Sequence, residues 1–208
     1  MRLLITQSLL SAWQYQYSGF DQYGENGDEY REKASVDFLS TLRREPRTPS
    51  EAMQKGIDFE DLVISICSGE GDTEHKWYKA AQEVAREVER GQFQVVATKE
   101  LTVAGLDLLL YGRLDCLRAG RIKDIKYSSK YEVGKFFNSP QHPMYMEMIP
   151  EATQFDYVVS NGTRVWRETY RRDECRPVQG LITDFIQYLE INGLMPLYQK
   201  YWESRRSA

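Results

Sequence analysis

Two neighbouring runs of strand-forming residues lie near the middle of this 208-residue chain. Residues 108–117 and 121–127 are both rich in apolar, β-branched and aromatic side chains. The dipeptide Ala119-Gly120 between them is a turn signal. The pattern therefore predicts a β-hairpin, around which the remaining elements have to be arranged.

The register of this hairpin determines which of its charged side chains lie together. A two-residue loop would pair Arg118 with Arg121 and would place Asp115 directly opposite Asp124. Because side chains alternate along a strand, Lys126 would share the face of these two acids. Two carboxylates opposite each other repel and destabilise a sheet unless a positive charge lies between them. A divalent metal meets that need, since Mg²⁺ favours oxygen ligands and takes one or two carboxylates.

Two alternatives remain open at this point. Ala-Gly is not a preferred two-residue turn, and a bulge would shift the pairing by one residue. The charges would also be unremarkable if they simply faced solvent on an edge hairpin. Taken alone, an Asp-x-Lys pattern is common, and the hairpin by itself favours that second interpretation.

The segments on either side add two further candidate groups. Residues 49–67 carry apolar side chains at helical spacing, and Glu60 lies at the margin of the apolar stripe, where its carboxylate could point inward. Downstream, Gln141 and Tyr145 are four residues apart, so they would lie on one side of a helix. Pro143 is tolerated near the start of such a helix.

In this order the fragments resemble the PD-(D/E)XK nuclease superfamily, in particular its RecB-like and phage-exonuclease branch. The family pattern is Gly-x-x-x-Glu on a helix, Gly-x-x-Asp on a strand, acid-x-Lys on the next strand and Gln-x-x-x-Tyr on a helix. The matching residues are Gly56 with Glu60, Gly112 with Asp115, Asp124 with Lys126, and Gln141 with Tyr145. The resemblance covers roughly the central half of the chain, and residues 8–13 are similar to the opening helix of many RecB-like nucleases. Leu114 stands where the family has a nominal Pro.

The order of elements predicts an α/β fold with a mixed central β-sheet flanked by helices, and the family shares this restriction-endonuclease-like core. We expect one nuclease-like domain over residues 1–208, with helical elaborations at about 1–48 and about 177–208. Turn signals and periodicity predict the other elements. Helices are expected at 8–17, 29–44, 73–90, 178–190 and 194–202, strands at 93–103, 155–160 and 164–170, and a loop at 19–28.

The resemblance implies metal-assisted hydrolysis of a phosphodiester. Asp115 and Asp124 are expected to bind Mg²⁺ or Mn²⁺, with the backbone carbonyl of Ile125 as a further ligand. Glu60 would complete the set of ligands or serve a second metal. Lys126 would orient the attacking water or neutralise the phosphate.

Gln141 and Tyr145 are expected to be positioning groups, because an amide and a phenol can hydrogen-bond phosphate without altering the charge. Several RecB-like relatives also hold an iron–sulfur cluster with four cysteines. This chain has only three, Cys67, Cys116 and Cys175, which are widely separated. We therefore expect no iron–sulfur cluster.

The composition bears on the size of the core, the cellular location and the partners, and not on the chemistry. With 41% hydrophobic residues, the chain can bury a full core. It has no apolar run long enough to cross a membrane, and the apolar start at residues 1–5 is too short for a signal peptide. We expect a cytoplasmic protein with no membrane partner. The net charge of −4 argues only weakly against a nucleic-acid partner, since metal binding neutralises site carboxylates.

The expected function is a metal-dependent deoxyribonuclease, an exonuclease of phage or mobile-element recombination or repair. Its partners would be DNA and a recombination or single-strand-annealing protein, and the oligomeric state is open. The alternative is a nucleic-acid-binding module that keeps the fold without catalysis, although the complete set of two acids and a lysine favours the enzyme. A third, weaker interpretation is a structural or interaction protein.

Overall fold

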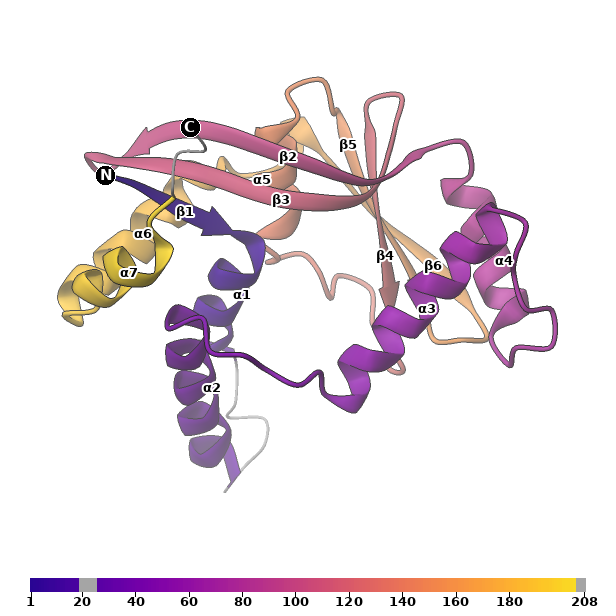
Figure 1. The fold of residues 1–208 in the computed structure, drawn as a ribbon, viewed down its shortest axis with the longest axis horizontal. Helices are drawn as coiled ribbons and strands as arrows, with labels where there is room; N and C mark the ends of the chain where they lie inside the picture. Colours follow the sequence, from indigo (N-terminus) through magenta and orange to yellow (C-terminus); the bar gives the residue numbers. More distant parts are fainter. Residues whose placement is uncertain (19–25, 205–208) are drawn as a thin grey trace. The chain divides into compact units, whose positions relative to one another are not determined.

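A mixed six-stranded sheet flanked by helices forms the fold (Figure 1), which confirms the predicted fold class. The structure is a computed structural model that describes residues 1–18 and 26–204, so most of the loop expected at 19–28 lies outside the described residues. The strand order is β1-β3-β4-β5-β6, and β2 also pairs with β3. The strands are β1 (Arg2–Thr6), β2 (Gln92–Val103), β3 (Leu106–Arg118), β4 (Arg121–Tyr127), β5 (Gln154–Ser160) and β6 (Val165–Arg171).

The helices agree with the expected pattern except at one start. They are α1 (Gln7–Tyr15), α2 (Gly27–Leu42), α3 (Glu51–Cys67), α4 (Tyr78–Val88), α5 (Gln141–Met148), α6 (Val178–Ile191) and α7 (Met195–Trp202). In the described residues, no helix combines the length and the apolar character needed to span a bilayer.

The predicted start of α4 was wrong, because residues 73–77 form turns instead of the helix expected from residue 73. Two side chains in or next to this segment, Asp72 and His75, accept hydrogen bonds from nearby backbone N–H groups. The carboxylate of Asp72 accepts the N–H of Glu74, and Nδ1 of His75 accepts the N–H of Trp77 at 3.2 Å. Such local bonds compete with helix formation, so α4 begins only at Tyr78.

The chain divides into two compact units, each assembled from separate segments. Unit 1 comprises Met1–Pro46, Ala97–Gly112 and Arg176–Ala208, and unit 2 comprises Arg47–Val96 and Arg113–Cys175. Strands β2 and β3 each cross from one unit to the other, because the unit boundaries fall within them.

Unit 1 begins with a strand, where the sequence predicted a helical start. β1 pairs in parallel with the first half of β3, from Arg2 opposite Asp107 to Thr6 opposite Tyr111. Leu3 and Ile5 are fully buried, so the short alternation of side chains fits a strand. Thr6 then caps α1 by accepting the N–H of Leu9, which explains why the helix follows without a loop.

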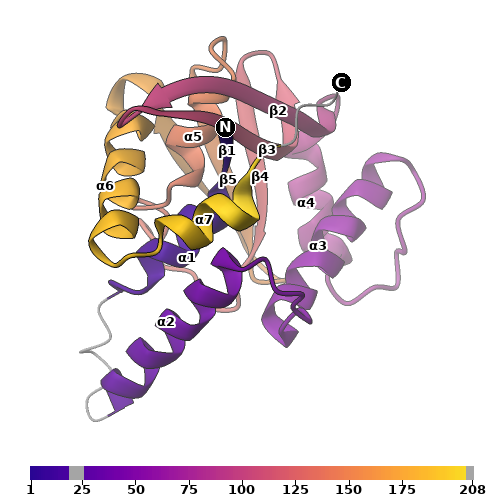
Figure 2. The same cartoon turned by 60° about the vertical axis from the view of Figure 1, so that its left-hand side comes forward.

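Helices α1 and α7 contact β1, and α6 packs against both of them (Figure 2). Aromatic rings connect these helices, because Phe185 of α6 contacts both Trp13 of α1 and Tyr198 of α7. Tyr198 donates a hydrogen bond to the carbonyl of Leu4 at 2.9 Å, and the indole of Trp202 donates to the carbonyl of Leu42 at 2.8 Å. The end of the chain therefore closes the core around its first strand.

Unit 2 contains the turn of the predicted hairpin, and the three residue pairs next to the turn have the predicted register. Arg118 pairs with Arg121, and the ladder continues to the pair of Cys116 with Lys123. Both loop residues have positive φ, 45° at Ala119 and 73° at Gly120, as a two-residue turn of the primed type requires. No bulge shifts the register, although the alanine is in a conformation that usually favours glycine or asparagine.

On the other side of β4 the sheet continues into β5 in parallel and then into β6 in antiparallel pairing. Helices α3 and α4 pack on each other and on these strands. Their apolar faces meet Ile125 of β4 and Val158 of β5 in one buried core. Because neighbouring residues on a strand face opposite ways, the flanking positions Asp124 and Lys126 lie on the face away from this core.

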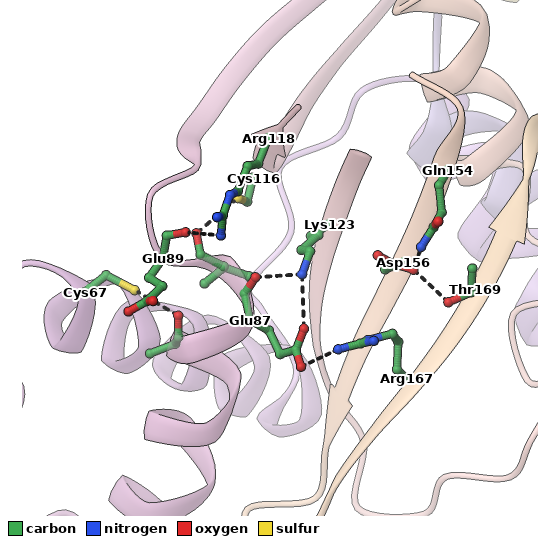
Figure 3. A network of polar contacts seen from close by, with 12 residues as sticks. Cys67, Glu87, Glu89, Cys116, Arg118, Lys123, Gln154, Asp156, Arg167 and Thr169 are labelled. Carbon is green, nitrogen blue, oxygen red and sulfur yellow. Dashed lines mark hydrogen bonds and ion pairs between the residues drawn. The ribbon is translucent and has the colours of Figure 1, made fainter. Parts of the chain in front are cut away.

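The buried side chain of Lys123 connects α4 to the sheet (Figure 3). Nζ of Lys123 donates to the carbonyl of Glu87 at 2.6 Å and lies 3.1 Å from Oε2 of the same residue. Arg167 of β6 forms an ion pair with the other oxygen of Glu87. Lys123 thus satisfies a carbonyl that the last turn of the helix leaves without a partner, and it fixes the helix end over β4.

Candidate functional site

The site is built around Asp124, in the middle of β4. Its carboxylate is almost fully buried, with 1% of the residue exposed. Nζ of Lys126, two residues further along the same face, lies 2.6 Å from Oδ2 of Asp124. The ammonium group is the less buried partner, with 32% of the side chain exposed, so it borders the solvent side of the pair.

Helix α5 places the two predicted positioning residues on this same face. Gln141 is its first residue, and the side-chain amide donates a hydrogen bond to Oδ1 of Asp124. Tyr145, one turn later, donates to the backbone carbonyl of Arg113 in β3 at 3.2 Å. The helix therefore touches both strands of the hairpin through residues four apart, as the spacing predicted.

Asp115 lies beside Asp124 on the neighbouring strand. Its Oδ2 accepts the backbone N–H of Ile125 at 2.8 Å. The paired ladder between β3 and β4 ends one step earlier, at Cys116 and Lys123, so a side chain binds the next amide. This bond holds the Asp115 carboxylate against β4, in the position that the register predicted.

Glu60 reaches the site from α3 and has a partner that sequence reasoning missed. The side-chain amide of Gln94 donates to Oε1 of Glu60 at 2.6 Å. Gln94 lies in β2 with φ of 53°, unusual for a residue other than glycine. Its sequence context carries no signal for this role, because the bond depends on a local backbone distortion and joins residues 34 positions apart.

The carboxyl groups influence one another through their charges. Burial raises the pKa of Asp115 well above its usual range, and the nearby carboxylates of Asp124 and Glu60 raise it further. Burial also raises the pKa of Glu60, against the lowering effect of the hydrogen bond from Gln94, and Asp124 adds to the rise. Three acids are therefore gathered near one ammonium group, and each ionised carboxylate disfavours the ionisation of its neighbours.

The ammonium group of Lys126 remains protonated in this setting. Burial by itself would lower the pKa of Lys126, but the carboxylates of Asp124 and Asp115 outweigh that effect and raise it. Tyr145 also keeps its proton, since burial and the same two carboxylates raise its pKa to about 12. The site therefore has a fixed cation and a fixed hydroxyl donor at neutral pH.

One oxygen of the site has no hydrogen-bond donor. Oδ2 of Asp124 is buried and is in ionic contact with Lys126, but that contact lacks the geometry of a hydrogen bond. Together with the Asp115 carboxylate, it offers hard oxygen donors of the kind that Mg²⁺ and Mn²⁺ bind. These donors fit a divalent cation held by two carboxylates.

The structure does not collect a larger set of ligands. Across residues 1–18 and 26–204, no group of three or more His, Cys, Asp or Glu side chains lies close enough together to hold one ion. A direct contribution of Glu60 to the same metal ion therefore stays a prediction.

Comparison with known proteins supports the fold and nothing finer. No family model matches the sequence. No curated protein matches it either. The fold is similar to that in the crystal structure of SSO0001, with a TM-score of 0.50 and 14% sequence identity over 90% of this chain and 77% of that chain. At this identity, the likeness bears on the α/β architecture alone.

Proposed function

We propose that this chain is a Mg²⁺- or Mn²⁺-dependent deoxyribonuclease of the PD-(D/E)XK type, in its RecB-like or phage-exonuclease branch. The observation that carries the proposal is the buried Asp124, paired with Lys126, hydrogen-bonded to Gln141 and placed beside Asp115. Acids that repel each other in a buried position weaken a fold, and strongly shifted pKa values cluster at functional sites.

The residues divide the chemistry among them. Asp115 and Asp124 would hold the metal through their carboxylate oxygens, with the carbonyl of Ile125 beside them. A bound divalent ion would lower the pKa of a coordinated water and offset the charge that builds on the phosphate. Lys126, whose positive charge is stabilised by the carboxylates of Asp124 and Asp115, would orient the attacking water or stabilise the negative phosphate.

Two residues position these groups but take no part in the bonds that form and break. Gln141 holds Asp124 in one orientation through the bond to Oδ1, while Oδ2, the oxygen in ionic contact with Lys126, accepts no hydrogen bond. Tyr145 joins α5 to β3 and offers a hydroxyl that stays protonated near neutral pH. Both are therefore positioning groups, and their loss should reduce activity less than the loss of Asp124.

The decisive experiment incubates the protein with end-labelled linear DNA and with closed circular DNA, with and without Mg²⁺ or Mn²⁺. We expect loss of the linear substrate alone, only with metal, and no loss with the Asp124→Asn variant. Binding of DNA without cleavage would favour the inactive binding module. A protein that neither binds DNA nor gains thermal stability from either metal would end the nuclease interpretation.

An exonuclease of this kind would act in the cytoplasm, in phage or mobile-element recombination or repair. A recombination or single-strand-annealing protein would then be its natural partner, since such a protein takes up the strand that an exonuclease exposes. Co-purification of that partner with the chain would test this part of the proposal separately.

A further inference from the structure

Residues 128–140 form the connection between β4 and α5. The connection leaves the site two residues after Lys126 and returns to it at Gln141. Both of its ends are therefore fixed by residues of the proposed active site. A molecule bound near either end of this connection would lie close to the proposed active site.

The connection is held in place by Glu168 of β6, a buried carboxylate. Glu168 accepts the hydroxyl of Tyr131 at 2.7 Å and the backbone N–H of Phe136 at 3.0 Å. Phe136 also stacks on Tyr157 of β5, with ring centroids 4.3 Å apart. These contacts anchor the connection at two points, so the residue after Phe136 is presented from a fixed backbone.

That residue, Phe137, faces the solvent. It is 70% exposed, whereas the neighbouring Phe136 is packed against the sheet. Val133 in the same connection is 90% exposed. An aromatic ring that is kept in water contributes little to folding, because hydrophobic stabilisation requires removal of apolar area from water.

The charges of this connection favour an anionic ligand. Lys130 and Lys135 are exposed in the same connection, which has one acid, Glu132. Nζ of Lys135 donates to the hydroxyl of Ser128 at 2.7 Å, so its position is fixed relative to the end of β4. An exposed ring in the same connection as two exposed lysines offers the groups that single-stranded nucleic acids bind, with stacked bases and neutralised phosphates.

We propose that Phe137 stacks on an unpaired base of the DNA strand that enters the site, while Lys130 and Lys135 contact the adjacent phosphates. The inference rests on the proposed nuclease function and adds a preference for a single-stranded end. It assigns Phe137 to substrate binding, not to the bond changes at Asp124.

The test measures binding and cleavage of a tailed duplex by Phe137→Ala. A second substrate has an abasic site in place of the base nearest the cleaved end. For the wild type we expect the abasic substrate to lose about tenfold in kcat/KM, the usual effect of one stacked base. Phe137→Ala should show that loss on the normal substrate and no further loss on the abasic one, because both changes remove the same contact.

Two variants control for folding and for general loss of apolar surface. Phe137→Trp keeps a stacking ring and should retain the wild-type preference for the normal substrate. Val36→Ala, at an exposed apolar position of α2, should change neither substrate. Circular dichroism and the thermal midpoint check that each variant is folded.

The outcomes separate this inference from the function on which it rests. If the wild type cleaves DNA and Phe137→Ala does so equally well, the stacking proposal fails and the nuclease proposal stands. Equal losses by Phe137→Ala on the normal and the abasic substrates would likewise exclude a base contact. If the wild type neither binds nor cleaves either substrate, both proposals fail.

Discussion

At the scale of single residues, the site combines groups whose charges conflict when no metal is present. Asp115 gains one backbone hydrogen bond, but it is buried beside other carboxylates. Lys126 compensates part of this charge through its contact with Asp124. The residual repulsion should be measurable as a dependence of stability on pH.

We predict that the metal-free protein loses stability as the pH rises above the usual pKa of aspartate, about 3.9. The pKa of Asp115 is raised in the folded state, so the folded chain binds this proton more tightly than the unfolded chain does. The free energy of unfolding therefore falls with rising pH until the raised pKa is passed. Asp115→Asn should flatten this dependence, measured by thermal unfolding in EDTA. Identical pH profiles for wild type and variant would contradict the expectation, and Asp173→Asn, at an exposed acid, is the control.

The second prediction at this scale concerns Lys126→Ala. Turnover at saturating DNA should fall by about two orders of magnitude or more, since a fixed charge at the reacting phosphate is lost. The affinity for metal should hold or rise, because a cation beside the ligands is removed. Without metal the variant should also be less stable, as Asp124 loses its ion-pair partner, and Mg²⁺ should restore much of the difference.

Single-turnover cleavage and calorimetric metal titration measure the two effects on Lys126→Ala separately. Lys79→Ala, at an exposed position of α4, is the matched control. A cleavage rate that stays at the wild-type value would remove Lys126 from the chemistry.

At the scale of elements, the sequence pattern predicted the elements whose partners are close in sequence. The bounds and register of the hairpin followed from alternation and one turn, because its strands are neighbours in sequence. The partner of β1 lies far along the chain in β3, so no nearby residue revealed that strand. The start of α4 depended on the side chains of Asp72 and His75, which periodicity ignores.

The candidate site shows the same division. The predicted hairpin register placed Asp115, Asp124 and Lys126 on one face, and the resemblance to the nuclease family placed Gln141 beside them. The bond between Gln94 and Glu60 could not be foreseen, because it joins residues 34 positions apart and Gln94 has an unusual φ of 53° within a strand.

An element-scale prediction concerns the turn between β5 and β6. Gly162 has φ of 91°, and a Cβ there would lie 2.5 Å from Cδ1 of Trp77. Gly162→Ala should therefore cost about 2 to 3 kcal/mol, from backbone strain and from displacement of the indole. Gly180→Ala is the control, because it lies in α6 with open space around it and should stabilise by about 0.5 to 1 kcal/mol. Urea unfolding that ranks the two variants in the opposite order would refute this account.

At the scale of the whole molecule, each compact unit is assembled from segments that are distant in sequence. All the residues of the candidate site lie in unit 2. Unit 1 combines the first and last segments of the chain, including β1, α6 and α7. A disturbance of the last helix should therefore act on the core around the first strand.

Trp202→Ala tests that expectation. The indole donates to the carbonyl of Leu42, is buried against Tyr198 and lies under the guanidinium group of Arg44 at 4.2 Å. Loss of these contacts and of the buried volume should cost about 3 to 5 kcal/mol. Equilibrium denaturation measures the loss. A cost below about 1 kcal/mol would mean that α7 is dispensable for unit 1.

The junction of β1 with the end of the chain also bears on biosynthesis. Leu3 bridges to Glu203, and the N–H of Ser204 donates to the carbonyl of Arg2 at 2.8 Å. During translation β1 leaves the ribosome before its partner in β3, and before residues 203 and 204. Until then the strand has an unpaired edge and exposed leucine and isoleucine side chains, which are features that chaperones bind and that lead to aggregation. Chains that stop before residues 203 and 204 should therefore be poorly soluble, while chains that include these residues should not.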